Sequence, residues 1–176
     1  MEEHTDEALM TEVAQGNLDL LRILFERHHV HIFNFLYQMS HDRMLSEDLT
    51  QETFYKLMKY RSSYNNGKFV SWLFTIARNT LKTHYTREKE KFRDLEGLEH
   101  QLTESAEDKN ENLSKLAMAI EKLGQSDKEL LVLNRLQEIK YHELAEILNS
   151  TPGAIKTKVS RALKKLKAIY FENIEL

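Results

Sequence analysis

Five side chains that can contact DNA share one face of a helix predicted near the C-terminus. They are Lys156, Thr157, Ser160, Arg161 and Lys164. At 100° per residue they lie opposite the apolar stripe of the same helix. Short hydroxyls and amines reach base edges in the major groove, and cations bind phosphates. This pattern is typical of a DNA-recognition helix, although an amphipathic helix with a solvated basic face would show it too.

The residues around this helix predict a helix-turn-helix over Ile139–Lys167. A first helix from about Tyr141 to Leu148 has apolar residues at i, i+3 and i+4. Thr151 is a suitable N-cap, and Pro152, the only proline, falls at the first position of the second helix, where an N–H has no helical partner. Turn, cap and basic face agree, which favours DNA binding.

A second polar surface lies on a helix that Ser46 is predicted to cap. The outer arc of this helix carries Asp48, Gln51, Glu52, Tyr55 and Lys59. The arc is either a solvated face or a docking surface for a basic partner helix.

A third polar surface combines a loop with the helix that follows it. Residues 61–68 (RSSYNNGK) predict a polar loop, and residues 69–87 predict a helix. The side of this helix opposite its apolar residues carries Ser71, Thr75, Arg78, Asn79, Lys82 and Thr86, with Trp72 at the rim. Cations and amides beside an aromatic ring suit single-stranded nucleic acid. A core tryptophan beside a solvated polar side explains the pattern equally well.

The composition predicts that helices alone position these side chains. The 176 residues include five glycines, one proline and no long alternating β-branched runs, which favours an all-α fold. Further helices are predicted over residues 5–14, 18–39 and 113–123, and from a cap at Ser126 to Leu136. No apolar run is long enough to span a membrane, and the acidic N-terminus is unlike a signal peptide. We therefore expect a cytoplasmic protein without membrane insertion.

Charge is distributed unevenly along the chain, whose formal net charge is −3. Residues 140–167 hold seven Lys or Arg against two Glu, whereas residues 1–60 hold eleven Asp or Glu against five Lys or Arg. Residues 88–112 lack helical periodicity and hold nine acidic and four basic residues, which predicts a flexible acidic linker. A basic C-terminal part and an acidic N-terminal part indicate two partners of different charge.

No motif in the sequence indicates an enzyme, a metal site or a cofactor. The absence of cysteine excludes disulfides, zinc fingers and thiol catalysis. His28 and His31 are spaced for a shared metal, but no carboxylate completes a ligand set. Gly67–Lys68 lacks the upstream glycine of a phosphate-binding loop, and no nucleophile elbow occurs.

Taken together, these stretches resemble the two-domain extracytoplasmic-function (ECF) sigma factors of bacterial RNA polymerase. The segment SEDLTQETFYKLMKY is similar to the polymerase-docking helix of that family, and FVSWLFTIARNTLKTHYTR to its minus-ten element reader. EIKYHELAEILNSTPGAIKTKVSRALKKLK is similar to its minus-thirty-five reader. The resemblance implies a region 2 helical bundle over residues 1–87, a linker over 88–112 and a region 4 helix-turn-helix over 113–176.

The resemblance also implies roles for individual residues. By this resemblance, the residues that would contact the clamp helices of the polymerase β′ subunit are Asp48, Gln51, Glu52 and Tyr55. The residues that would contact DNA of the minus-ten element are Asn65, Asn66, Trp72, Arg78, Asn79 and Lys82. The residues that would contact DNA of the minus-thirty-five element are Lys156, Thr157, Ser160, Arg161 and Lys164. The implied partners are core RNA polymerase, through β′ and β, promoter DNA in double- and single-stranded form, and an anti-sigma protein.

Several positions depart from the pattern of the family. Thr83 stands where an aspartate is common, Gly124 replaces a frequent proline, and Pro152 is unusual. Glu138 and Asn149 replace frequent glycines. The alternative function is a stand-alone helix-turn-helix regulator, which would bind palindromic duplex DNA as a dimer. That alternative leaves the face around Asp48 and Glu52 and the face around Trp72 and Lys82 without a role.

Overall fold

The structure is a computed structural model, and it describes residues 4–94 and 111–172. Within these ranges the regular secondary structure is entirely helical. The chain divides into two units, Met1–Thr103 and Glu104–Leu176. This confirms the predicted all-α fold with two helical domains. The predicted linker over residues 88–112 lies mostly outside the described residues, so its expected flexibility stays a prediction.

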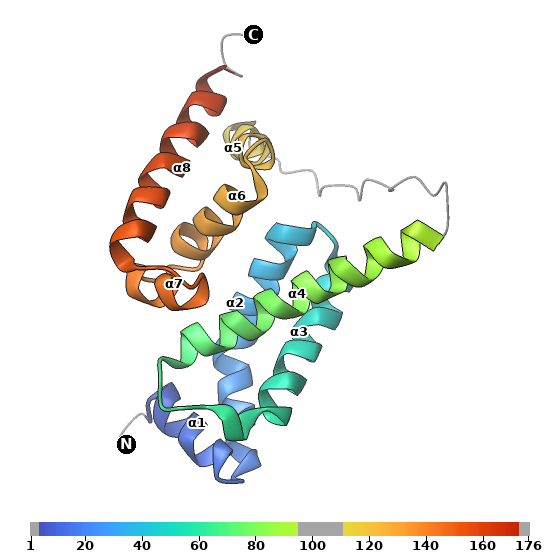
Figure 1. Cartoon of the computed structure of the whole chain (residues 1–176), viewed down its shortest axis with the longest axis vertical. Coiled ribbons are helices and arrows are strands. Elements are labelled where there is room, and N and C mark those ends of the chain that lie inside the picture. Colours follow the sequence, from blue (N-terminus) through green and yellow to red (C-terminus); the bar gives the residue numbers. More distant parts are fainter. Residues whose placement is uncertain (1–3, 95–110, 173–176) are drawn as a thin grey trace. The chain divides into compact units, whose positions relative to one another are not determined.

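The first unit is a bundle of four α-helices joined by short turns (Figure 1). Its elements are α1 (Asp6–Ala14), η1 (Leu18–Leu20), α2 (Leu21–Ser40), α3 (Arg43–Lys59), η2 (Arg61–Ser63) and α4 (Phe69–Asp94). Helix α3 packs against both α2 and α4, and α1 packs against α2. The apolar faces meet in a core that includes Met10, Ile32, Phe35, Leu57 and Leu73. Burial of these faces positions the polar surfaces predicted from the sequence.

The ends of α1 follow the local chemistry of the sequence. The Thr5 hydroxyl accepts a hydrogen bond from the Ala8 backbone N–H at 3.2 Å, which caps α1. After α1, Gly16 has φ 112°, a backbone conformation that would be strained in a residue with a side chain. The predicted helix over residues 5–14 is confirmed, and the predicted segment 18–39 corresponds to η1 and α2.

The predicted cap of the next helix is wrong. Asp42, in extended conformation, caps α3 because its carboxylate accepts a hydrogen bond from the Leu45 backbone N–H at 3.0 Å. Ser46 is buried one turn inside the helix, where its hydroxyl donates to the Asp42 carbonyl oxygen at 2.6 Å. A serine whose side chain bonds back to the preceding turn satisfies its hydroxyl without capping anything.

Helix α4 is longer than predicted. It continues to Asp94, seven residues beyond the expected end at Arg87. Residues from Lys82 to Arg93 are exposed or half-buried, so apolar periodicity does not mark this part of the helix.

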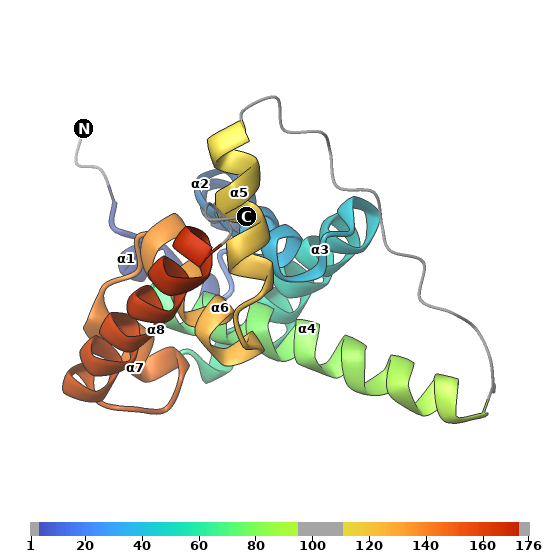
Figure 2. The ribbon, with the colours of Figure 1, turned by 90° about the horizontal axis from the view of Figure 1, so that it is seen from above.

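In the second unit, three helices pack against the long C-terminal helix α8 (Pro152–Glu172) (Figure 2). They are α5 (Glu111–Glu121), α6 (Gln125–Leu131) and α7 (Tyr141–Ile147). A short π-helical segment, η3 (Val132–Leu136), follows α6. The core includes Leu130, Leu133, Leu144, Ile155 and Val159. Leu136, at the end of the predicted helix that begins at Ser126, is 50% exposed.

Helices α7 and α8 form the predicted helix-turn-helix. The Thr151 hydroxyl accepts a hydrogen bond from the Ala154 backbone N–H at 3.2 Å, and Pro152 is the first residue of α8. Asn149, with φ 51°, adopts the left-handed conformation that turns the chain between them. By contrast, Ser126 does not cap α6, because that helix already begins at Gln125 after Gly124.

Within residues 4–94 and 111–172, no helix combines the length and the apolar character that crossing a bilayer requires.

Candidate polymerase and nucleic-acid interfaces

The predicted polymerase-binding residues all lie on α3. We call Asp48, Gln51, Glu52 and Tyr55 the α3 face. Asp48, Gln51 and Tyr55 are exposed, and Glu52 is half-buried. Opposite them, Leu49, Thr53 and Leu57 are buried against the bundle. The amphipathic pattern of α3 therefore turns this face to solvent.

Glu52 is already engaged within the helix. Its carboxylate lies 2.8 Å from the Lys56 ammonium, one turn further along. The same ammonium donates to the Thr80 hydroxyl of α4 at 3.2 Å. A partner cation would therefore compete with Lys56 for Glu52, whereas Asp48 lies one turn closer to the N-terminus of α3.

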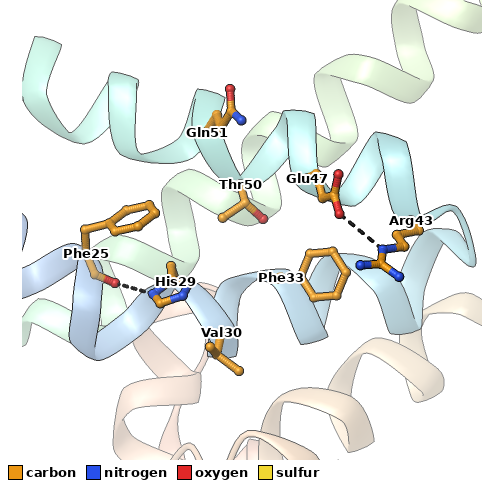
Figure 3. A pocket seen from close by; sticks show the side chains of 8 residues that line it. All are labelled: Phe25, His29, Val30, Phe33, Arg43, Glu47, Thr50 and Gln51. Atoms are coloured by element: carbon orange, nitrogen blue, oxygen red, sulfur yellow. Dashed lines mark hydrogen bonds and ion pairs between the residues drawn. The ribbon is translucent and has the colours of Figure 1, made fainter.

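A hollow of about 320 Å³ adjoins the α3 face, between α2 and α3 (Figure 3). Its lining includes Phe25, His29, Val30 and Phe33 of α2 and Gln51 of the α3 face. The Phe25 and His29 rings are stacked with centroids 4.6 Å apart. Gln51 thus borders an apolar surface as well as the acidic one.

The predicted minus-ten residues lie on the loop after η2 and on α4. Asn65 and Asn66 are exposed on the loop, and Asn66 has φ 54°. On α4, Asn79 and Lys82 are exposed, whereas Arg78 and Trp72 are half-buried. We call these six residues the asparagine-loop surface. Ser71, expected on the same polar side, is instead 3% exposed.

Tyr64, which the sequence did not single out, supports this surface. Its ring is buried and lies 5.2 Å from the Trp72 ring, at 55° to it. Its hydroxyl donates to the Gly67 carbonyl oxygen at 2.5 Å, which closes the turn that carries Asn65 and Asn66. Burial raises the pKa of Tyr64 to about 12, and the nearby carboxylates of Glu7 and Asp6 add to the effect. Tyr64 therefore remains a neutral donor at physiological pH.

Helix α1 also contacts the asparagine-loop surface, although the sequence did not indicate this. The Glu7 carboxylate accepts a hydrogen bond from the Phe69 backbone N–H at 3.2 Å. The Thr11 hydroxyl lies 3.2 Å from the Asn66 side-chain oxygen. These contacts join residues 62 and 55 positions apart, and no local pattern signals them.

The predicted minus-thirty-five residues share the solvent side of α8. We call Lys156, Thr157, Ser160, Arg161 and Lys164 the α8 face, and all five are exposed. Ile155, Val159 and Ala162 are buried on the other side of the helix. The Thr157 hydroxyl donates to the Gly153 carbonyl oxygen at 3.1 Å, so its lone pairs and methyl group remain available to a ligand.

The histidines of α2 have structural partners. His28 lies 2.7 Å from an Asp6 carboxylate oxygen, and a ring nitrogen of His29 lies 2.8 Å from the Phe25 carbonyl oxygen. Among the described residues, no group of three or more His, Cys, Asp or Glu side chains is arranged to hold a metal ion.

Family models match both units of the chain. The model described as Sigma-70 region 2 matches residues 24–91, and the model described as Sigma-70, region 4 matches residues 113–166. The first match covers the α3 face and the asparagine-loop surface, and the second covers the α8 face.

Curated relatives are similar over most of their length. The ECF RNA polymerase sigma factor SigM of Bacillus subtilis is 32% identical over 79% of this chain and 88% of its own. The RNA polymerase sigma factor YlaC of the same species is 30% identical, over 85% of this chain and 91% of its own. The RNA polymerase sigma factor CarQ of Myxococcus xanthus is 27% identical over 93% of this chain and 96% of its own.

Solved structures show the same fold. CnrH, in complex with the cytosolic domain of CnrY, matches with a TM-score of 0.72 at 22% identity, over 93% of this chain and 96% of its own. The sigma factor RpoE of Bartonella quintana, in complex with the anti-sigma factor NepR, matches with a TM-score of 0.70 at 23% identity, over 84% and 94%. From the two region matches and the similarity to SigM and YlaC, we conclude that this chain belongs to the ECF sigma factors of RNA polymerase.

Proposed function

We propose that this sigma factor performs promoter-specific initiation through three separate surfaces, each with its own partner. The observation that carries the proposal is the difference in their chemistry. The α3 face is acidic and amide-bearing, the asparagine-loop surface combines amides with an aromatic ring, and the α8 face is cationic and hydroxyl-bearing. One chain thus presents a surface for a basic protein helix, one for unpaired bases and one for duplex DNA.

The α3 face would bind the clamp helices of the β′ subunit. Exposed Asp48 is available to a partner cation, and exposed Gln51 adds directional hydrogen bonds. Glu52 would exchange its ion pair with Lys56 for one with the polymerase. Further contacts with the β subunit would complete the holoenzyme.

The asparagine-loop surface would bind the non-template strand of the minus-ten element. A base that leaves the duplex loses a few kcal/mol of stacking, about the amount that a pocket and phosphate contacts return. Asn65 and Asn66 would contact such a base, while Arg78, Asn79 and Lys82 would follow the strand along α4.

The α8 face would enter the major groove at the minus-thirty-five element. Lys156 and Thr157 lie in the first turns of α8, the part of a recognition helix that reaches base edges. Arg161 and Lys164 lie further along the same side, where phosphates are within reach of long cations.

In this proposal the protein makes and breaks no covalent bond, because nucleotide addition belongs to the polymerase. It would act in the bacterial cytoplasm. An anti-sigma protein that covers these surfaces would hold it inactive. The structurally similar RpoE of Bartonella quintana forms a complex with the anti-sigma factor NepR.

Run-off transcription with core polymerase tests the proposal. We expect the full chain to direct a promoter-dependent transcript with core enzyme and to bind the promoter specifically only within the holoenzyme. A dimer that binds palindromic duplex DNA tightly by itself, without any promoter-dependent transcript, would refute the proposal in favour of a stand-alone regulator.

A further inference from the structure

We propose that α1 is a positioning element of the minus-ten site, in which Thr11 orients the Asn66 side chain and Glu7 fixes the start of α4. The inference rests on the proposed role of Asn66 in contacting a promoter base. It assigns functions to two residues outside the region 2 match, which begins at residue 24.

Helix α1 is held firmly enough on the bundle to position a loop. Its apolar residues Leu9, Met10 and Val13 are buried. Asp6, in its first turn, lies 2.8 Å from the Arg27 guanidinium and 2.7 Å from the His28 ring nitrogen, both on α2. The two oxygens of the Asp6 carboxylate thus fix the first turn of α1 against α2.

The residue after Asp6 reaches a different helix. The Glu7 carboxylate accepts a hydrogen bond from the backbone N–H of Phe69, the first residue of α4, at 3.2 Å. The first N–H groups of a helix lack partners within it, and a negative charge at that end is stabilising. Glu7 therefore caps α4 from another helix and fixes the point at which the loop ends.

One turn further along α1, Thr11 contacts the loop itself. Its hydroxyl donates to the Glu7 carbonyl oxygen at 2.8 Å and to the Asn66 side-chain oxygen at 3.2 Å, so its single proton is shared between the two acceptors. Asn66 has φ 54°, a left-handed conformation that asparagine tolerates better than most residues other than glycine. The Thr11 contact restricts rotation of the Asn66 amide in this turn.

Restricting the amide has a consequence for base selection. A freely rotating asparagine offers its oxygen or its amino group with equal ease and so suits bases of opposite hydrogen-bonding character. An asparagine held by Thr11 presents one of these groups outward. Thr11 should therefore affect discrimination between bases more than total affinity for the strand.

The test uses the full chain with core polymerase and a promoter that this holoenzyme transcribes. Open-complex formation is measured on promoters that carry each of the four bases at every minus-ten position in turn. Thr11→Val removes the hydroxyl but keeps the shape of the side chain. At one minus-ten position, we expect the ratio of open-complex formation between the best and the worst base to fall roughly two- to tenfold, which is the effect of one hydrogen bond. Thr11→Ser, which retains the hydroxyl, should restore most of that ratio.

Asn66→Ala separates this inference from the proposed function. If Thr11 acts through Asn66, the double variant should discriminate no worse than Asn66→Ala alone. Losses that add in the double variant would overturn the inference. Loss with Asn66→Ala but none with Thr11→Val would also overturn it, while leaving the minus-ten role of Asn66 intact. If Asn66→Ala has no effect at any minus-ten position, both the inference about Thr11 and the proposed minus-ten role of Asn66 are refuted.

A spectroscopic measurement on the free full-length protein checks the contact directly. The side-chain amide signals of Asn66 in a ¹H–¹⁵N spectrum should shift in Thr11→Val and remain close to wild type in Thr11→Ser. Unchanged signals in Thr11→Val would overturn the inference. If Thr11→Val melts at a lower temperature than wild type, Thr11→Ala is a second variant that lacks the hydroxyl. We expect the same shift of the Asn66 amide signals in it.

Discussion

The Tyr64 hydroxyl donates a hydrogen bond to the Gly67 carbonyl oxygen at 2.5 Å, across the turn that presents Asn65 and Asn66. The ring of the same tyrosine contacts Trp72. One side chain therefore connects the loop to the first turn of α4. The contact depends on a protonated phenol, so it links the loop to pH.

We expect the free energy of unfolding of the first unit to fall as pH rises between about 10 and 12. An unfolded tyrosine loses its proton near pH 10, whereas burial and the carboxylates of Glu7 and Asp6 raise the folded pKa of Tyr64 to about 12. Below pH 10 both states keep the proton, so this dependence is absent there. Urea unfolding followed by Trp72 fluorescence at several pH values measures it.

Two phenylalanine variants separate Tyr64 from other groups that titrate at high pH. Tyr64→Phe should show a shallower decline than wild type across this window. Tyr60→Phe, which removes the hydroxyl of a tyrosine that is 50% exposed, is the matched control. Equal slopes for Tyr64→Phe and wild type would show that Tyr64 does not carry the pH dependence.

Replacing two carboxylates of the α3 face should weaken polymerase binding without unfolding the protein. Asp48→Ala combined with Glu52→Ala removes both negative charges from the proposed contact with the β′ clamp helices. Because both residues lie outside the core, we expect a melting temperature within a few degrees of wild type. The affinity for core polymerase should fall by about tenfold or more. A binding titration with labelled protein measures the change.

The matched control changes the net charge equally at another place in the same unit. Asp19→Ala combined with Glu26→Ala removes two exposed carboxylates outside the α3 face. We expect this variant to bind core polymerase nearly as wild type does. Equal losses in the two double variants would indicate a general charge effect rather than a specific docking surface.

Arg161→Ala should weaken binding to the minus-thirty-five element. A bidentate contact with a base would make the loss about 1–3 kcal/mol and relax specificity at one position, whereas a phosphate contact would mainly reduce the salt dependence. Holoenzyme binding at several salt concentrations distinguishes the two. Lys165→Ala is the control on the same helix, because its ammonium lies 2.9 Å from Asp127 and is engaged within the unit. Unchanged affinity and salt slope for Arg161→Ala would place it outside the interface.

Glycine at either of two positions in the second unit should stabilise the protein. Glu138 has φ 56° and Asn149 has φ 51°, both in the left-handed region that favours glycine. A left-handed conformation costs an ordinary residue about 1–2 kcal/mol of stability. Glycine avoids this cost, but the greater conformational entropy of its unfolded state offsets part of the gain. We therefore expect a gain of about 0.5–1 kcal/mol from Glu138→Gly and less from Asn149→Gly, because asparagine tolerates this conformation. Thermal unfolding measures both.

The opposite substitution provides the control for this argument. Gly16→Ala places a side chain on a residue with φ 112°, so it should destabilise the first unit. A destabilising effect of Glu138→Gly would show that the Glu138 side chain contributes contacts that exceed its backbone strain.

Local chemistry in the sequence predicted helix ends well where one side chain decides them. Thr151 and Pro152 are examples, because a cap needs only its own helix. Ser46 and Ser126 show the limit of this reasoning. Both are good capping residues in isolation, but helix α3 starts earlier at the Asp42 cap and α6 starts earlier after Gly124. Competing caps within a few residues cannot be ranked from propensity alone.

The candidate surfaces were predictable to the extent that they follow from helix periodicity. The α3 face and the α8 face required only the spacing of polar residues on one helix. The contacts of Glu7 with Phe69 and of Thr11 with Asn66 depend on how α1 folds back onto the bundle. No spacing in the sequence contains that information, so the supporting residues of the asparagine-loop surface became visible only in three dimensions.

The C-terminal part of α4 would change length if it unwound. From Arg87 to Asp94 the helix lies beyond its last buried residue, Leu81, and beyond half-buried His84 and Tyr85, and the pair of His84 with Glu88, 3.1 Å apart, helps to maintain it. As a helix the eight residues from Arg87 to Asp94 span about 12 Å, and as an extended chain they would span about 28 Å. Unwinding would therefore more than double the reach of this segment without disturbing the core of the bundle.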